Sequence, residues 1–262
     1  MTQEAQKPRR RTVTAWIVYD MANTMFYAGI VGVLFPLWVT TDLGGDDADF
    51  GFTIAISMAL VLVMAPVIGA LSDQVGRRLP FLAVGTALGI AALVSMSGDT
   101  FFMTLALFGL AFVAFNLANV FYNALLSQVS TERTRGTISG LCIGLGYIGA
   151  AISLSIGVLL VDTQGYAFVF RIIGVLIAVL SLPLIVLLKE SPVSSIKRGP
   201  LRAVTATLSE LRWTVHRVRQ SPGLARFLLL GSGTRGRSTR VLPLLCCMPP
   251  IPWDSLLRRC SS

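Results

Sequence analysis

The chain has 262 residues, of which 54% are hydrophobic and only 13% are charged. Soluble domains carry about 25% charged residues, so this composition excludes a water-soluble globular protein and predicts an integral membrane protein. The formal net charge of +9 would suggest a nucleic-acid partner in a soluble protein. Here the basic residues flank apolar segments, which favours anionic lipid headgroups as partners and not nucleic acid.

Six apolar segments follow one another, each long enough to cross a bilayer as a tilted helix. They cover residues 14–39, 51–71, 81–97, 101–122, 137–161 and 167–188. The first segment follows a basic stretch, but its length and the lack of a small-residue cleavage site indicate a retained helix and not a secretory signal. The sequence therefore predicts an all-α bundle of six transmembrane helices over residues 14–188, after a basic N-terminus over residues 1–13.

Basic and acidic residues divide between alternate loops of the predicted bundle. One set of loops and the N-terminus contain the basic residues Arg9, Arg10, Arg11, Arg77, Arg78, Arg133, Arg135 and Lys189. The other set contains no Lys or Arg. Its charged residues are Asp42, Asp46, Asp47, Asp49, Asp99 and Asp162. By the positive-inside rule, both ends of the six-helix bundle are expected in the cytoplasm, with the bundle in the plasma (inner) membrane. Arg171 is the exception, and we expect it to reach the headgroups or to pair with Asp162.

The chain changes character after residue 188. Apolar residues between 201 and 218 recur every three or four positions, with arginines on the other faces. This pattern predicts an amphipathic helix on the cytoplasmic membrane surface within a linker over residues 189–223; a solvated linker is the alternative. A seventh apolar run starts at Leu224 and stops near Leu230, before a tail rich in arginine, proline and cysteine. We interpret residues 224–262 as an aborted seventh helix and a disordered tail, most simply explained by a reading-frame change or a premature end.

A charged turn joins the second and third apolar segments. Its distinctive residues are Gly69, Asp73, Gly76, Arg77 and Arg78. The glycines permit close backbone approach and positive φ, and Asp73 can pair with either arginine. The turn is either a topological anchor at the membrane face or a functional element.

Two polar stripes interrupt the apolar segments. They are Asp20, Asn23 and Tyr27 on the first predicted helix, and Asn116, Asn119 and Asn123 on the fourth. An ionisable group inside a span costs about 2.5–3.5 kcal/mol on insertion scales, so Asp20 should face a cavity or a partner. The stripes together predict a hydrated solute path, and the alternative is that the asparagines only bond helix to helix. On the fifth helix, Gly140 and Gly144 are spaced to let another helix pack closely.

The sequence contains no pattern typical of a metal or catalytic centre. His216 is the single histidine, and no cysteine spacing resembles a zinc site. The spans contain no paired carboxylates and no nucleophile–base pair, so we expect neither an enzyme nor a cofactor.

The charged turn resembles the signature between the second and third helices of the major facilitator superfamily, Gly-x-Leu-Ser/Ala-Asp-Arg/Lys-x-Gly-Arg/Lys-Arg/Lys. It departs from that signature at Gln74, where the family usually has a basic residue. Further motifs resemble the vacuolar amino-acid-effluxer-like branch of the superfamily. They are Tyr19-Asp20-Met21-Ala22-Asn23-Thr24, Phe121-Tyr122-Asn123-Ala124-Leu125-Leu126, Arg135-Gly136-x-x-Ser139-Gly140 and Gly144-x-Gly146-Tyr147-x-Gly149.

The resemblance implies a secondary transporter that moves a small solute, such as an amino acid, by alternating access. It implies that the first and fourth helices line the cavity, and we include Tyr147 among the path residues. Coupling to protons is expected through Asp20, and the charged turn is expected to gate the conformational change. The resemblance covers the amino-terminal half of such a transporter. We therefore expect no transport by this chain alone, unless it joins a second half or self-associates; a membrane-bound interaction module is the alternative.

Overall fold

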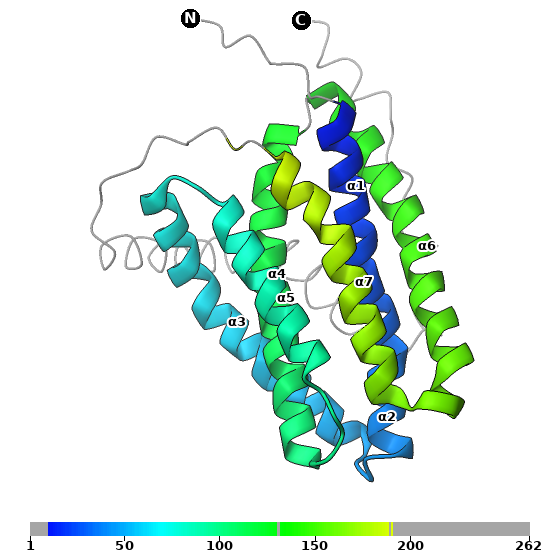
Figure 1. The fold of residues 1–262 in the computed structure, drawn as a ribbon. Coiled ribbons are helices and arrows are strands. Elements are labelled where there is room, and N and C mark those ends of the chain that lie inside the picture. The colour runs from blue at the N-terminus through cyan, green and yellow to red at the C-terminus, as the bar shows by residue number, and fades with distance from the viewer. Residues whose placement is uncertain (1–9, 130–131, 189, 191–262) are drawn as a thin grey trace, which may run out of the picture. The chain divides into compact units, whose positions relative to one another are not determined.

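The computed structural model describes residues 10–129, 132–188 and 190, which all lie within one compact unit (Figure 1). The predicted surface helix and the irregular tail lie outside the described residues. No β-strand occurs in the described part of the chain, so the expected all-helical class is confirmed. The elements are α1 (Arg10–Thr24), η1 (Met25–Leu34), α2 (Phe35–Thr41), α3 (Asp47–Val75), α4 (Leu79–Val94), α5 (Phe101–Val129), α6 (Glu132–Gln164) and α7 (Tyr166–Leu187).

Five helical stretches in the described residues are long and apolar enough to cross a membrane. They are Arg11–Thr41, Asp47–Val75, Phe101–Leu125, Ser139–Gln164 and Tyr166–Leu187. The remaining predicted span, residues 81–97, corresponds to α4, an apolar helix of 16 residues. At 1.5 Å per residue this helix rises about 24 Å, which is less than the ~30 Å hydrocarbon core.

The first span is a continuous helix whose middle part has a different winding. Residues Met25–Leu34 form a π-helix, in which each turn is wider than in an α-helix. At its end the Phe35 N–H donates to the Ile30 carbonyl, five residues earlier. The widened segment packs against α6, where Ser153 lies against Gly29 and Gly157 lies against Leu34.

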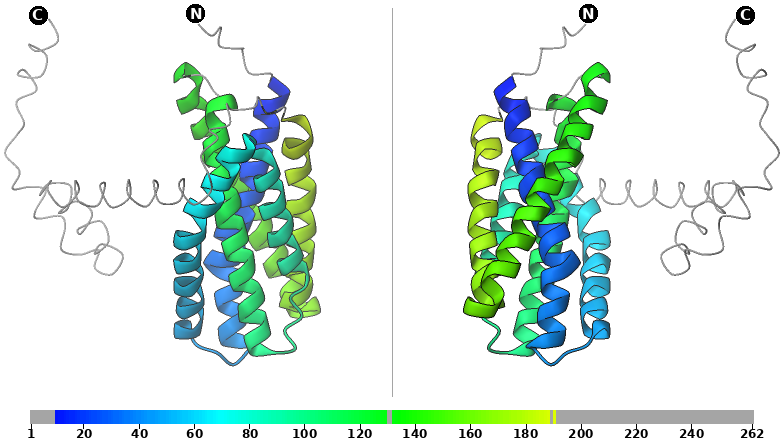
Figure 2. Two further views of the ribbon diagram at one scale, coloured as in Figure 1. Left: turned by 90° about the vertical axis from the view of Figure 1, so that its left-hand side faces the viewer. Right: turned by 90° about the vertical axis from the view of Figure 1, so that its right-hand side faces the viewer.

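The helices form a bundle in which α1 packs against α6 and α7, while α5 packs against α3 and α4 (Figures 1 and 2). Aromatic residues fill much of the interior, and the Phe35 and Phe108 rings stack with centroids 3.7 Å apart. Much of α3 stays uncovered: Phe52, Leu62 and Val63 are each about two-thirds exposed. Apolar side chains on that face are suited to contact with lipid or with another apolar surface.

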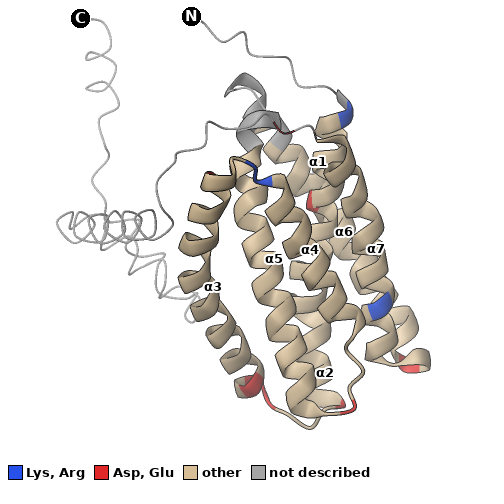
Figure 3. Cartoon of the chain, turned by 60° about the vertical axis from the view of Figure 1, so that its left-hand side comes forward, with Lys and Arg blue, Asp and Glu red and all other residues tan. Residues whose placement is uncertain are grey.

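Charged residues separate along the bundle. Figure 3 shows most of the described acidic residues at the end opposite to the start of α1 and to the α3–α4 turn. Arg171 lies in the first turns of α7 and is exposed. Asp73–Arg78 is the one ion pair among the described residues, so the alternative pairing of Arg171 with Asp162 is not formed.

The expectation for Gly140 and Gly144 was wrong. Among the described residues, no atom lies within 4 Å of a Cβ added at either position. The glycines of α6 that contact α1 are Gly146, which faces Thr24, and Gly149, which faces the Met21 carbonyl. The spacing of Gly140 and Gly144 and that of Gly146 and Gly149 both place the two glycines on one face of a helix. The rotation of α6 about its axis decides which of these faces packs against α1.

Candidate functional site

The two predicted polar stripes meet between α1 and α5. Asn23 on α1 donates its side-chain N–H to Asn119 Oδ1 on α5, with 3.4 Å between the two atoms. Asn123 donates to the Asn119 carbonyl at 2.9 Å and approaches Asn119 Oδ1 at 3.5 Å. Asn119 is therefore the residue through which the two stripes are joined.

The remaining members of the stripes behave differently. Asn116 donates to the Phe112 carbonyl of its own helix at 2.7 Å, so this side-chain nitrogen bonds within its own helix. The buried Tyr27 hydroxyl has no hydrogen-bond partner among the described residues. Its ring lies edge-on to Phe26 and Phe112, with centroids 5.1 and 6.4 Å away. Tyr27 thus presents an unused polar atom inside an apolar region.

Asp20 is partly buried, about three helical turns from the start of α1. The Thr24 hydroxyl donates to the Asp20 backbone carbonyl at 2.9 Å, which leaves the carboxylate free for contacts between helices. The carboxylate interacts with the side chain of Tyr122 on α5. On α6, a Cβ added to Gly146 would lie 3.6 Å from Asp20 Oδ2. The carboxylate therefore lies where α1, α5 and α6 converge.

Four residues of the polar contacts near Asp20 were not among the predicted site residues. The Tyr122 hydroxyl is 3.9 Å from the Cys142 sulfur on α6. Tyr19 bonds Thr86 on α4, with 2.8 Å between the hydroxyl oxygens. Cys142 lies four residues before Gly146 on the stripe of α6 that faces α1, but the sequence did not indicate that this stripe would be the one in contact. Nothing in the sequence pattern indicated Thr86.

Tyr147 is not brought to this group. It is 70% exposed on α6 and makes no hydrogen bond or ring contact with the residues that the structure describes. Its neighbour Gly146 faces Asp20 and Thr24, so the next position along the helix points away from them.

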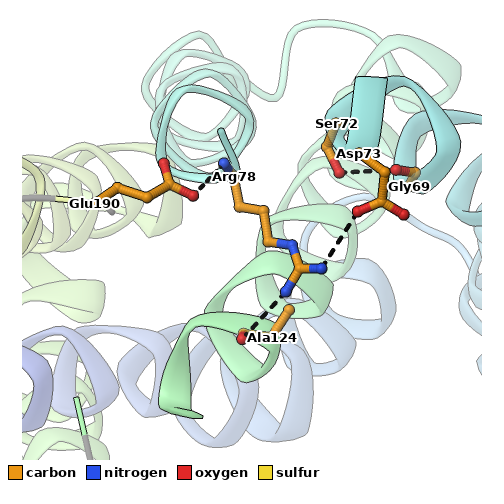
Figure 4. A network of polar contacts seen from close by, with 6 residues as sticks. All are labelled: Gly69, Ser72, Asp73, Arg78, Ala124 and Glu190. Atoms are coloured by element: carbon orange, nitrogen blue, oxygen red, sulfur yellow. Dashed lines mark hydrogen bonds and ion pairs between the residues drawn. The ribbon is translucent and has the colours of Figure 1, made fainter. Parts of the chain in front are cut away.

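The charged turn forms a second polar site, at one end of the bundle (Figure 4). Gly76 ends α3 in the left-handed conformation, with φ of 69°, and its N–H donates to the Ser72 carbonyl at 2.9 Å. Gly69 lies within α3 and has no positive φ, so the conformational reason expected for it does not apply. The buried Gln74 Nε2, at the position that departs from the signature, lacks a partner among the described residues.

Arg78 is the arginine that pairs with Asp73. Its guanidinium lies 3.2 Å from Asp73 Oδ1 and donates to the Ala124 carbonyl of α5 at 3.4 Å. Arg77 is exposed. Glu190, which follows α7, accepts backbone hydrogen bonds from Arg78 and Leu79 at 2.5 and 2.9 Å (Figure 4). The turn is therefore connected to α5 and to the end of α7.

An all-helical bundle with several membrane-crossing helices and buried polar side chains between them defines a multi-pass membrane protein. The chain belongs to the major facilitator superfamily, because the model of that family matches residues 20–248. Members of this superfamily are transporters, so membership agrees with the expected class of protein.

Two curated proteins are similar to part of the chain. An uncharacterized MFS-type transporter, YxiO, of Bacillus subtilis (strain 168) is 28% identical over 154 residues, which are 55% of this chain and 36% of that protein. An uncharacterized protein of Aquifex aeolicus (strain VF5) is 28% identical over 184 residues, which are 69% of this chain and 46% of that protein. The chain thus spans less than half the length of both relatives.

Proposed function

We propose that this chain supplies one wall of a path along which a small solute crosses the membrane by alternating access. The observation that carries this proposal is the contact between Asn23 and Asn119, which brings two polar stripes together beside Asp20. Polar side chains inside spans are costly unless they bond one another or line a hydrated cavity. Transporters of this kind bind solutes at the interface of two helical repeats.

The other proposed path residues are Tyr27, Asn116, Asn123 and Tyr147. The Tyr27 hydroxyl, which has no partner in the described part of the chain, is available to a solute. The side-chain nitrogen of Asn116 bonds the Phe112 carbonyl, and no partner of its side-chain oxygen is seen among the described residues, so we propose that this oxygen faces the solute. Tyr147 is exposed on the side of α6 turned away from α1, so we propose that it faces a second helical unit.

The solute class that we propose is a small metabolite such as an amino acid, as in the vacuolar amino-acid-effluxer-like branch. Asp20 would bind a proton or a positively charged group of the solute. It is the acidic residue that lies well inside a span in the described part of the chain, which makes it the best candidate for coupling.

We propose that the residues of the charged turn, Gly69, Asp73, Gly76, Arg77 and Arg78, act in gating. The support is the contact of Arg78 with both Asp73 and the Ala124 carbonyl, which ties α3 and α4 to α5. A change in the relative position of these helices would break those bonds.

For the membrane arrangement, we propose six spans, with the shorter α4 as the sixth, in the plasma (inner) membrane. Both ends of the six-helix domain, residues 14–188, would face the cytoplasm. The separation of charges between the two ends of the bundle supports this orientation (Figure 3). The segments proposed to flank this domain are the basic residues 1–13, the linker 189–223 and the tail 224–262.

The second candidate is a membrane-bound interaction module without transport activity. The large exposed apolar face of α3 favours this candidate, because such a face can serve association with another membrane protein or a second copy.

A reconstitution experiment separates the two. The 262-residue chain is placed in lipid vesicles and tested for uptake of a panel of radiolabelled amino acids, with and without a proton gradient. A second protein carries the chain joined in frame near Leu230 to the carboxy-terminal half of the Bacillus relative. We expect no accumulation by the chain alone, accumulation of at least one amino acid by the joined protein, and its loss in Asp20→Asn. Inactivity of both proteins across the panel would favour the interaction module.

A further inference from the structure

Tyr122 lies where α1, α5 and α6 meet, and its hydroxyl approaches polar side chains on both neighbouring helices. The hydroxyl oxygen is 3.9 Å from the Cys142 sulfur on α6. The Asp20 carboxylate of α1 faces the same stretch of α6, because it lies against Gly146, four residues after Cys142, and it interacts electrostatically with the Tyr122 hydroxyl. Tyr122 and Cys142 are only 5% and 7% exposed, so the protein itself must satisfy their polar atoms.

The Tyr122 ring is held by aromatic stacking. The Trp16 ring stacks on it with centroids 4.0 Å apart and planes at 15°, and the Tyr19 ring does so at 5.1 Å and 24°. Tyr19 is itself anchored, because Thr86 donates to the Leu82 carbonyl and so accepts the Tyr19 hydrogen bond. With its ring packed against two others, Tyr122 has little freedom to turn its hydroxyl away from Asp20.

The surroundings of the carboxylate are also shaped by a missing side chain. A Cβ added to Gly146 would lie 3.6 Å from Asp20 Oδ2 and 2.8 Å from the Thr24 hydroxyl oxygen. Glycine at this position therefore lets α6 approach Asp20 without pushing the carboxylate away from Tyr122. No basic side chain pairs with Asp20 among the described residues. A hydrogen-bond donor is what such a carboxylate needs, and the Tyr122 hydroxyl is suitably placed.

We propose that Tyr122 is the positioning residue of Asp20. Its hydroxyl donates to the Asp20 carboxylate and accepts a hydrogen bond from the Cys142 thiol, so that one chain of hydrogen bonds joins α6, α5 and α1. This inference rests on the proposed function, in which Asp20 acts in the solute or proton path. It adds that the direction of the carboxylate is set by α5 and α6 and not by α1 alone.

Infrared spectroscopy tests the hydrogen-bond chain without any solute. In the full chain, Cys246, Cys247 and Cys260 are replaced by serine, which leaves Cys142 as the only thiol. The S–H stretching band then reports on Cys142, and the carboxyl band that disappears in Asp20→Asn reports on Asp20. We expect Tyr122→Phe to move the S–H band to the position of a free thiol and to shift the carboxyl band.

Tyr166→Phe is the matched control, because it removes the hydroxyl of another buried tyrosine whose ring stacks on Trp38, 5.9 Å away. It should leave both bands in place. Should Tyr122→Phe fail to fold, Cys142→Ala takes its place and is expected to shift the Asp20 band, since the thiol polarises the Tyr122 hydroxyl. Unchanged bands in the folded variants would overturn the inference.

Transport by the joined protein separates this inference from the proposed function. Tyr122→Phe should lower uptake about tenfold, the effect of losing one hydrogen bond to a charged group. Shifted bands together with normal transport in Asp20→Asn would retain the positioning contact and reject the proposed path. Unshifted bands together with loss of transport in Asp20→Asn would reject the positioning contact and retain the proposed path.

Discussion

Glu190 and Arg78 are 112 positions apart in the chain, yet the Glu190 carboxylate accepts the Arg78 backbone N–H at 2.5 Å. The other carboxylate oxygen accepts the N–H of Leu79, the first residue of α4, at 2.9 Å. The first N–H groups of a helix have no partner within the helix, and a carboxylate there is also favoured by the helix dipole. Glu190, the third residue after the end of α7, thus caps the start of α4.

Removal of this cap should destabilise the bundle. We expect Glu190→Ala to cost about 0.5–2 kcal/mol, as for other lost helix caps, and to lower the midpoint of thermal unfolding in detergent. Asp162→Ala is the control, because Asp162 is an exposed acidic residue at the opposite end of the bundle. Equal midpoints for the two variants would show that the Glu190 contacts are energetically unimportant.

The two arginines of the turn should differ in their effect on stability. Arg78→Ala removes the contacts with Asp73 and the Ala124 carbonyl, whereas Arg77 is exposed. Because both partners are partly solvated, we expect a loss of about 0.2–1 kcal/mol for Arg78→Ala. Arg77→Ala should be close to neutral, and thermal unfolding of both variants in one detergent gives the comparison. A larger loss in Arg77→Ala would contradict the pairing seen here.

Glycines on α6 should respond to alanine according to the face on which they lie. A Cβ at Gly149 meets the Met21 carbonyl of α1, so Gly149→Ala should cost about 1–3 kcal/mol through overpacking. A Cβ at Gly144 meets no atom of the described residues within 4 Å, so Gly144→Ala should be neutral, or stabilising by up to about 1 kcal/mol, because alanine is the better helix former. Measured stabilities in the opposite order would place α1 against the other stripe of α6.

The asparagines should contribute unequally to solute binding. Asn119 contacts both Asn23 and Asn123, whereas the side chain of Asn116 bonds its own helix. We therefore expect Asn119→Ala to raise the KM for uptake by the joined protein several-fold more than Asn116→Ala does, since one unpaired polar group costs about 1–3 kcal/mol. Similar KM values for the two variants would argue that the Asn23–Asn119 contact only packs the helices.

Labelling of introduced cysteines checks the proposed orientation. In a background without the four native cysteines, Asp46→Cys and Asp99→Cys should react with a membrane-impermeant thiol reagent added to intact cells. Arg77→Cys should react only after the cells are opened, because the arginine-bearing turn is expected in the cytoplasm. The reverse pattern would invert the topology.

The sequence by itself was sufficient for the class of protein and for the helices. A backbone inside lipid must satisfy its own hydrogen bonds, so long apolar segments predict helices whatever their neighbours are. All six predicted segments lie in or largely within helices of the structure, although α4, at 16 residues, is shorter than each of the five stretches long enough to cross a membrane. The helical spacing of the polar residues on each of the two helices likewise indicated the faces that contact each other through Asn23 and Asn119.

Only the tertiary structure decided which side chains become partners. Helical periodicity allowed α6 to present either Gly140 and Gly144 or Gly146 and Gly149 to α1, and packing against the π-helical part of the first span selected the second pair. Asp73 could have paired with either arginine, but Gly76 turns the chain so that Arg78 reaches it. The contacts of Tyr122 with Cys142 and of Glu190 with α4 join distant parts of the chain. They depend on how whole helices are placed and rotated, which local sequence patterns do not encode.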